Sequence, residues 1–236
     1  RLLYTVMALG LPVGEGLAFD FLEDGRSDPA RYGDSRITSG YLNGVITINV
    51  LEADPVAREA ERIALNEPQR TLLGHMRHES GHHYYSLLSG ATGGSKEEDT
   101  RDFAREFLEH FGDPAASYSE ALEQYYASGP PADWQMRFIS PYATSHPFED
   151  WAETWSHYLN MVDALETGAS HNMLADDMST RPFEERLGKW RALCTAVNEL
   201  NRSSGADDVY PYVVSPVAAN KLEFVERSIR QLQARC

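Results

Sequence analysis

The sequence predicts an α+β fold in which helices dominate. Two observations lead to this prediction: candidate strands occur only before Asp54, and helical periodicity with helix caps fills the rest of the chain. Strands grouped ahead of a series of helices are typical of α+β chains. The 236 residues are 42% hydrophobic and 24% charged, a composition that is expected to support one sizeable hydrophobic core.

The N-terminal region, residues 1–53, should contain strands and loops. Leu17–Leu22 is one candidate strand. Residues 44–50 are the stronger candidate, because polar residues at 47 and 49 alternate with apolar residues at 46, 48 and 50. Mixed polarity on one side suits a strand near the edge of a sheet.

Residues 54–168 should be mostly helical. Asp54 followed by Pro55 predicts a helix start, with a capping carboxylate and proline at the first helical position. A second helix should run from near Pro68 to about Ser89. The other expected helices begin with a capping box at Ser95–Glu98 and end at Gly112, run from Asp113–Pro114 to Gly129, and span about 147–167 with Gly168 as the terminator.

Residues 169–236 should form a C-terminal helical part. Two amphipathic helices are expected there, at roughly 182–201 and 216–235. We therefore expect residues 1–236 to fold as a single domain with three consecutive parts, 1–53, 54–168 and 169–236.

Charge and cysteine content exclude several classes of function. The formal net charge is −15, which repels a phosphate backbone, so nucleic-acid binding is not expected. No stretch approaches the roughly 20 apolar residues that span a bilayer, so no membrane partner is expected. Cys194 and Cys236 form neither a disulfide framework nor a cysteine zinc site, which favours a cytoplasmic location. Because the sequence begins with Arg1, we expect that an upstream segment, with any targeting signal, precedes it.

An HExxH motif, His78-Glu79-Ser80-Gly81-His82, lies inside the second predicted helix. Residues four apart share one helical face, so His78 and His82 can bind one zinc ion at about 2.0–2.1 Å. Glu79 lies further round the helix, where it can act as general base on a metal-bound water. The sequence thus predicts a single Zn²⁺ cofactor.

The third zinc ligand should come from a distant part of the chain. The metzincin form of the motif requires a histidine six residues after His82, but Leu88 occupies that position. His75 shares the stripe of His78 and His82, yet it lies roughly 10 Å along the axis from His82. We therefore interpret His75 and His83 as ordinary surface or core histidines.

Glu149 and Glu153 are the best candidates, because they are four residues apart on one face of the long helix predicted at about 147–167. One carboxylate can bind zinc while the other accepts a hydrogen bond from the distal N–H of a ligating histidine. We assign Glu149 as the ligand and Glu153 as the hydrogen-bond partner. The alternative assigns Glu153 as the ligand with His157 in support, and Asp150 is interpreted as a solvated or capping residue.

These motifs resemble those of known zinc peptidases. The pair His78 and His82, followed by Glu149 and Glu153, resembles the gluzincin pattern of thermolysin. The Glu-Asp-Trp-Ala-Glu run is also similar to the corresponding motifs of anthrax lethal factor and Mlc titration factor A. A tyrosine seven residues before the glutamate faces the metal in those proteins, and Tyr142 occupies that position here.

The chain, most clearly residues 40–165, also resembles a family of predicted bacterial zinc-binding metallopeptidases. Four segments carry this resemblance: residues 44–49, 71–79, 129–134 and the segment around Glu149. Members often carry an N-terminal zinc ribbon, whereas this sequence has no CxxC pair. The resemblance implies a zincin-like fold, with the strand region packed on the HExxH helix.

The resemblance implies zinc-dependent hydrolysis of peptide bonds in a peptide or protein substrate. Glu79 would remove a proton from the water, and Tyr142 would stabilise the oxyanion. The strand at 44–50 could pair with an extended substrate. Two alternatives remain: a zinc-binding regulatory module with weak catalysis, and a zinc hydrolase of a non-peptide amide. The presence of Glu79 favours an active enzyme.

Overall fold

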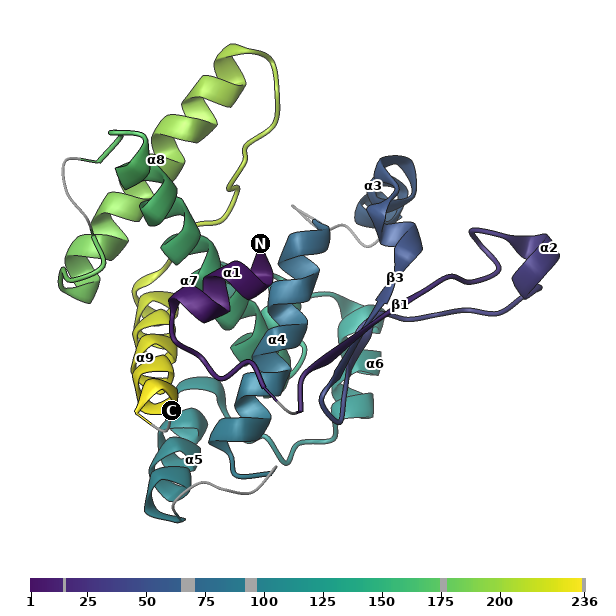
Figure 1. Cartoon of the computed structure of the whole chain (residues 1–236), viewed down its shortest axis with the longest axis horizontal. Coiled ribbons are helices and arrows are strands. Elements are labelled where there is room, and N and C mark those ends of the chain that lie inside the picture. Colours follow the sequence, from purple (N-terminus) through teal and green to yellow (C-terminus); the bar gives the residue numbers. More distant parts are fainter. Residues whose placement is uncertain (15, 65–70, 92–96, 175–177, 235–236) are drawn as a thin grey trace.

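The computed structural model describes residues 1–14, 16–64, 71–91, 97–174 and 178–234. Helices surround one long central helix, and a small sheet from the N-terminal region lies beside them (Figure 1). The prediction of a mostly helical α+β fold is therefore confirmed. No helix of the described residues is both long and apolar enough to cross a bilayer.

The sheet has three strands in the order β1-β3-β2. They are β1 (Ala18–Leu22), β2 (Gly40–Leu42) and β3 (Val45–Asn49), with β3 parallel to β1 and antiparallel to β2. The prediction that the strand at 44–50 lies near an edge is wrong, because β3 is the central strand. Its polar Asn49 is buried and satisfied, since its amide donates to Asp24 Oδ2 at 2.8 Å.

The edge strand β2 was not predicted, although a turn signal marks its end. Asn43 and Gly44 both have positive φ angles, 47° and 87°. Two consecutive left-handed residues form the tight hairpin turn for which Asn-Gly is the preferred sequence. This turn places β2 antiparallel to β3 and leaves it at the edge of the sheet.

Each predicted helix in the second and third parts of the chain has a counterpart. The helices are α1 (Leu2–Ala8), α2 (Pro29–Tyr32), α3 (Pro55–Ala64), α4 (Leu72–Leu88), α5 (Glu97–Phe111), α6 (Tyr118–Ser128), α7 (Pro147–Ser170), α8 (Phe183–Ser203) and α9 (Pro216–Gln233). Short 3-10 helices occupy η1 (Val50–Ala53), η2 (Trp134–Met136) and η3 (Tyr142–Thr144). Helices α1 and α2 fall in the region expected to hold only strands and loops.

Local hydrogen bonds explain where the helix boundaries differ from prediction. Helix α4 begins at Leu72, because the Thr71 hydroxyl accepts from the Gly74 amide at 2.9 Å. The predicted start at Pro68 and the capping residue Ser95 lie outside the described residues. Helix α6 begins only at Tyr118, because the Asp113 carboxylate caps a single turn by accepting from Ala115 N at 2.9 Å.

Gly168 does not terminate α7, contrary to prediction. The helix continues to Ser170, and Gly168 is buried within it. A Cβ atom at this position would lie 3.1 Å from Leu193 Cδ2 and 3.2 Å from Leu174 Cδ1. The glycine therefore serves close packing against α8 and the segment that follows α7.

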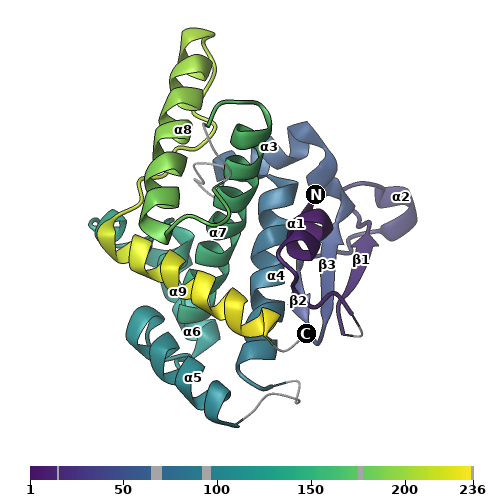
Figure 2. The ribbon, with the colours of Figure 1, turned by 60° about the vertical axis from the view of Figure 1, so that its left-hand side comes forward.

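Helices α4 and α7 pack against each other at the centre of the molecule (Figure 2). Trp151 and Trp155 of α7 are fully buried, and their indole N–H groups donate to Gly81 O at 2.8 Å and Ser80 Oγ at 3.1 Å. A Cβ atom on Gly81 would lie 3.0 Å from Ala152 Cα and 3.2 Å from Trp155 Cβ. The HExxH helix thus approaches the glutamate helix closely because Gly81 carries no side chain.

We expect Gly81→Ala to lower the free energy of unfolding by about 1–3 kcal/mol, because the added methyl group overpacks the contact between α4 and α7. Urea denaturation followed by circular dichroism measures the change. Gly188→Ala is the matched control, since a Cβ atom in that part of α8 meets open space. The control should gain roughly 0.5–1 kcal/mol from helix propensity. Equal effects at both positions would contradict the packing argument.

Candidate metal centre

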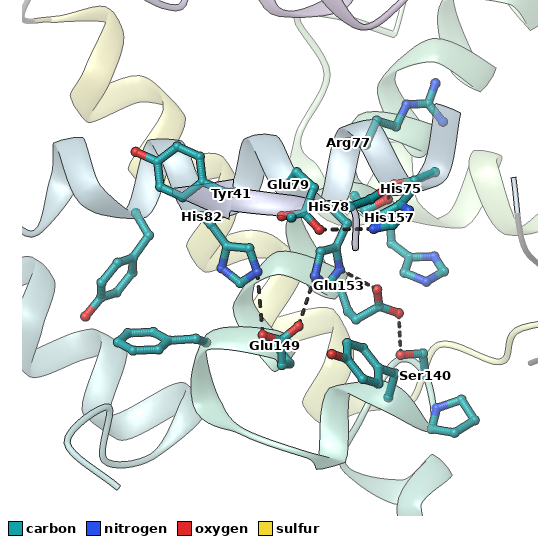
Figure 3. A pocket seen from close by; sticks show the side chains of 18 of the residues that line it. Tyr41, His75, Arg77, His78, Glu79, His82, Ser140, Glu149, Glu153 and His157 are labelled. Carbon is teal, nitrogen blue, oxygen red and sulfur yellow. Dashed lines mark hydrogen bonds and ion pairs between the residues drawn. The ribbon is translucent and has the colours of Figure 1, made fainter. Parts of the chain in front are cut away.

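A cleft of about 840 Å³ lies over α4 and α7 and is also lined by residues of β2, α6 and η3. At its floor, the structure brings together His78, His82 and Glu149 (Figure 3). One candidate ligand atom from each of these residues lies within 4.8 Å of the others. The three predicted zinc ligands, which come from α4 and α7, therefore meet at one place.

The distances between these atoms suit a small divalent cation. Nε2 of His78 lies 3.0 Å from Glu149 Oε2, and Nε2 of His82 lies 3.6 Å from Glu149 Oε1. Ligand atoms around a tetrahedral zinc ion, each about 2.0–2.1 Å from the metal, are about 3.3 Å apart. Two imidazoles and one carboxylate at these distances form a donor set that fits a zinc ion.

The negative charge around the site also favours the binding of a cation. Glu149 is 1% exposed and Glu79 is 5% exposed, so two carboxylates are withdrawn from solvent beside the imidazoles. Burial alone would raise the pKa of Glu149, but hydrogen bonding and proximity to His78 outweigh it and lower that pKa to about 2. Buried anions of this kind are stable only when paired or bound to a metal.

Glu153 occupies the position expected for a hydrogen-bond partner of His78, one of the candidate ligands. Its Oε1 lies 2.7 Å from Nδ1 of His78, the ring nitrogen on the far side from Glu149, and its Oε2 accepts from Ser140 Oγ at 2.5 Å. His157, the support in the alternative assignment, instead pairs through Nδ1 with the Tyr210 hydroxyl at 2.7 Å. This geometry favours Glu149 over Glu153 as the ligand.

Glu79 is held by a histidine that was interpreted from the sequence as an ordinary one. Nε2 of His75 lies 3.1 Å from Glu79 Oε1, and Nδ1 of His75 lies 2.7 Å from Glu52 Oε2. Burial lowers the pKa of His75, but hydrogen bonds to Glu52 and Glu79 outweigh it and raise that pKa to about 9. The spacing of four residues between His75 and Glu79 was a usable signal. No sequence pattern indicated that Glu52, in η1, would bond to His75.

For an enzyme in which Glu79 acts on a metal-bound water, we expect His75→Gln to lower kcat by roughly tenfold to a hundredfold, because Glu79 loses the group that orients its carboxylate. Zinc affinity should change little, since His75 touches none of the three candidate ligands through a hydrogen bond. Steady-state kinetics and a chelator-competition titration measure the two quantities. The exposed His171→Gln is the matched control. An unchanged kcat in His75→Gln would show that Glu79 needs no such support.

Two tyrosines approach the site. The ring of Tyr142 lies 5.9 Å from the ring of His78 between centroids, and both residues line the cleft. The hydroxyl of Tyr118 donates to Glu149 Oε1 at 2.8 Å, a contact that no sequence pattern indicated. Burial and the nearby Glu149 raise the pKa of both phenols, so both remain hydrogen-bond donors near neutral pH.

Two expectations near the site are wrong. Asp150 is not solvated: it is 1% exposed, and its Oδ2 pairs with Lys221 Nζ at 2.5 Å, which fastens α9 to α7. The strand at 44–50 cannot offer an edge to a substrate, because β3 is bonded on one side to β1 and on the other to β2. The edge strand that lines the cleft is β2, through Gly40 and Tyr41.

Comparison with known proteins gives matches over nearly the whole chain. Residues 1–228 match the family described as "Putative zinc-binding metallo-peptidase". Uncharacterized proteins from Mycobacterium bovis and from two strains of Mycobacterium tuberculosis are 39% identical to the chain over 246 residues. These alignments cover 98% of the chain and 67% of each relative. No solved structure matches significantly.

Proposed function

Since this chain belongs to the zinc-binding metallopeptidase family, we propose that it hydrolyses peptide bonds in peptide or protein substrates at one zinc ion. The observation that carries the proposal is the convergence of His78, His82 and Glu149 at the floor of a cleft, with Glu79 beside them. A glutamate as the third ligand makes the site one of the gluzincin type.

We also propose that residues 1–236 form one zincin-like domain. The sheet lies beside α4, which carries the HExxH motif, and α7 supplies the glutamates. The two ends of the chain are tied together, since Gln233 of α9 donates to the Leu9 carbonyl at 2.6 Å. The C-terminal helices thus complete the core around the site rather than forming a separate unit.

Each residue of the site has a distinct role in the proposed reaction. His78, His82 and Glu149 would hold the zinc ion, which when bound lowers the pKa of water and polarises the substrate carbonyl. Glu79 accepts a proton from the attacking water and returns it to the leaving amine. Because its Oε1 is bonded to His75, its Oε2 is the oxygen left to accept the proton. Glu153 and Ser140 fix the ring of His78.

A digest of a peptide mixture tests the proposal directly. The zinc-loaded protein should cleave the mixture, a chelator should stop cleavage, and added zinc should restore it, with the products identified by mass spectrometry. Absence of cleavage by the zinc-loaded protein would overturn the proposal. Tight binding of peptides without cleavage would instead identify a zinc-dependent binding module.

Tyr142 is the proposed donor to the oxyanion, and Tyr118 is its natural comparison. We expect Tyr142→Phe to lower kcat by about 10²–10³, the usual effect of losing one oxyanion donor. Tyr118→Phe should have a smaller effect on kcat, because the Tyr118 hydroxyl is already engaged by Glu149. Steady-state kinetics on a peptide cleaved by the wild type compares the two. A larger loss of kcat in Tyr118→Phe than in Tyr142→Phe would identify Tyr118, rather than Tyr142, as the donor to the oxyanion.

A further inference from the structure

The cleft has two ends, and the antiparallel course of α4 and α7 defines them. Trp151, early in α7, donates to Gly81 O late in α4, whereas Ser156, further along α7, donates to Gly74 O early in α4. One end of the cleft therefore lies beyond His82, toward the C-terminus of α4. The other end lies beyond His78, toward the N-terminus of α4.

The end beyond His82 is lined by aromatic and aliphatic side chains, which we call the aromatic pocket: Tyr85, Tyr118, Leu122 and Phe148. Tyr85 and Phe148 are held by each other and by the core. The ring of Tyr85 lies 4.9 Å from the ring of Phe148 and 4.9 Å from that of the buried Phe107. The aromatic pocket thus forms an apolar wall beside Glu149, a proposed zinc ligand whose Oε1 accepts from the Tyr118 hydroxyl.

The opposite end, beyond His78, is polar. We define this polar end by the lining residues Arg77, Ser156, His157, Asn160, Tyr210 and Tyr212. Its polar groups are arranged in pairs, since His157 bonds to Tyr210 and the Arg77 guanidinium pairs with Asp163. Substrate residues at this end meet hydrogen-bonding side chains rather than an apolar wall.

The direction of β2 decides which part of a peptide meets which end. Ser39, just before β2, bonds to Glu52, which in turn bonds to His75 near the start of α4. Tyr41, within β2, lies with its hydroxyl 3.4 Å from Nδ1 of His83. Strand β2 therefore runs from the His75 end of the cleft to the His82 end, in the same direction as α4.

An extended peptide that adds to the edge of β2 is expected to pair antiparallel, the commoner and more stable arrangement. Such a peptide runs opposite to β2, from the His82 end to the His75 end. Its residues before the scissile bond then lie in the aromatic pocket, and its residues after the bond lie at the polar end.

We propose that this protein cleaves peptide chains on the carboxyl side of a large apolar residue, such as phenylalanine or leucine, whose side chain occupies the aromatic pocket. Polar residues are preferred after the cleaved bond. The inference rests on the proposed peptidase function and adds the substrate class. Apolar pockets discriminate between side chains that differ by one methylene by about 10–200-fold, so replacing phenylalanine by glycine should cost at least about tenfold in kcat/KM.

Cleavage of a peptide library by the zinc-loaded protein tests the position of the apolar residue. Mass spectrometry should find phenylalanine, tyrosine or leucine enriched immediately before the cleaved bond. Leu122→Asn should reduce this enrichment and lower kcat/KM at least about fivefold for a peptide with phenylalanine before the bond. The exposed Leu200→Asn in α8 is the control and should match the wild type. Enrichment after the bond, or none, would overturn the inference.

A binding measurement separates failure of this inference from failure of the proposed function. Two hydroxamates are compared by calorimetry on the zinc-loaded protein: acetyl-Gly-Gly-Phe-hydroxamate, with phenylalanine on the amino-terminal side of the zinc-binding group, and a succinyl-hydroxamate followed by phenylalanine amide. The first should bind at least about tenfold more tightly, and Leu122→Asn should remove most of the difference. Equal or reversed affinities would overturn the inference even if peptides are cleaved. If the protein cleaves no peptide but shows this difference, the proposed catalysis fails and the pocket assignment stands.

Discussion

Replacing Glu79 by glutamine is expected to lower kcat by about 10²–10⁴ and to leave the zinc content at one ion per chain. Glutamine has the same shape as glutamate but cannot accept a proton from water at neutral pH. Its amide oxygen can still face His75, so the surroundings of the side chain should be preserved. Mass-spectrometric detection of peptide cleavage, together with metal analysis of the same preparation, measures both quantities.

The comparison variant for Glu79→Gln is Glu184→Gln, which removes a carboxylate from the exposed start of α8. This variant should retain wild-type kcat, because its side chain lies outside the lining of the cleft. Wild-type turnover in Glu79→Gln would show that another group activates the water. Loss of zinc from Glu79→Gln would mean that Glu79 takes part in binding the metal, contrary to the role assigned here.

Local sequence patterns predicted the helices and the pairs of site residues well. A spacing of four residues fixes two side chains on one helical face whatever the rest of the fold does. For this reason, the pairing of His78 with His82 and of Glu149 with Glu153 follows from the sequence alone. The glycine signals were less reliable, because Gly168 serves packing inside α7 rather than ending it.

The features that sequence reasoning missed depend on contacts between distant segments. The bond from Tyr118 to Glu149, the bond from Glu52 to His75 and the ion pair between Asp150 and Lys221 each join different elements. Periodicity identifies which face of an element is apolar, but it does not identify which element will cover that face. The order of the strands was missed as well, because the three-residue β2 is too short to produce a sequence pattern of its own.

Removing the two proposed histidine ligands should abolish zinc binding and, with it, a zinc-dependent gain in stability. We expect His78→Ala combined with His82→Ala to reduce bound zinc from one ion per chain to nearly none. A metal that binds only the folded state stabilises it by about 2.7 kcal/mol when its free concentration is a hundred times the dissociation constant. The wild type should therefore show a higher Tm with zinc than with a chelator, and the double variant should show no such difference.

Two single variants refine this prediction by separating the proposed ligand from its neighbour. Glu149→Gln removes the carboxylate that faces both histidines, so it should weaken zinc binding more than Glu153→Gln, which disturbs only the orientation of His78. Loss of such an orienting partner usually costs about tenfold to a hundredfold in metal affinity. A chelator-competition titration ranks the zinc affinities of the two variants. The control His171→Ala should bind zinc as tightly as the wild type. If Glu153→Gln were the more damaging variant, Glu153 rather than Glu149 would be the third ligand, and the conclusion drawn from the bond between His78 and Glu153 would be reversed.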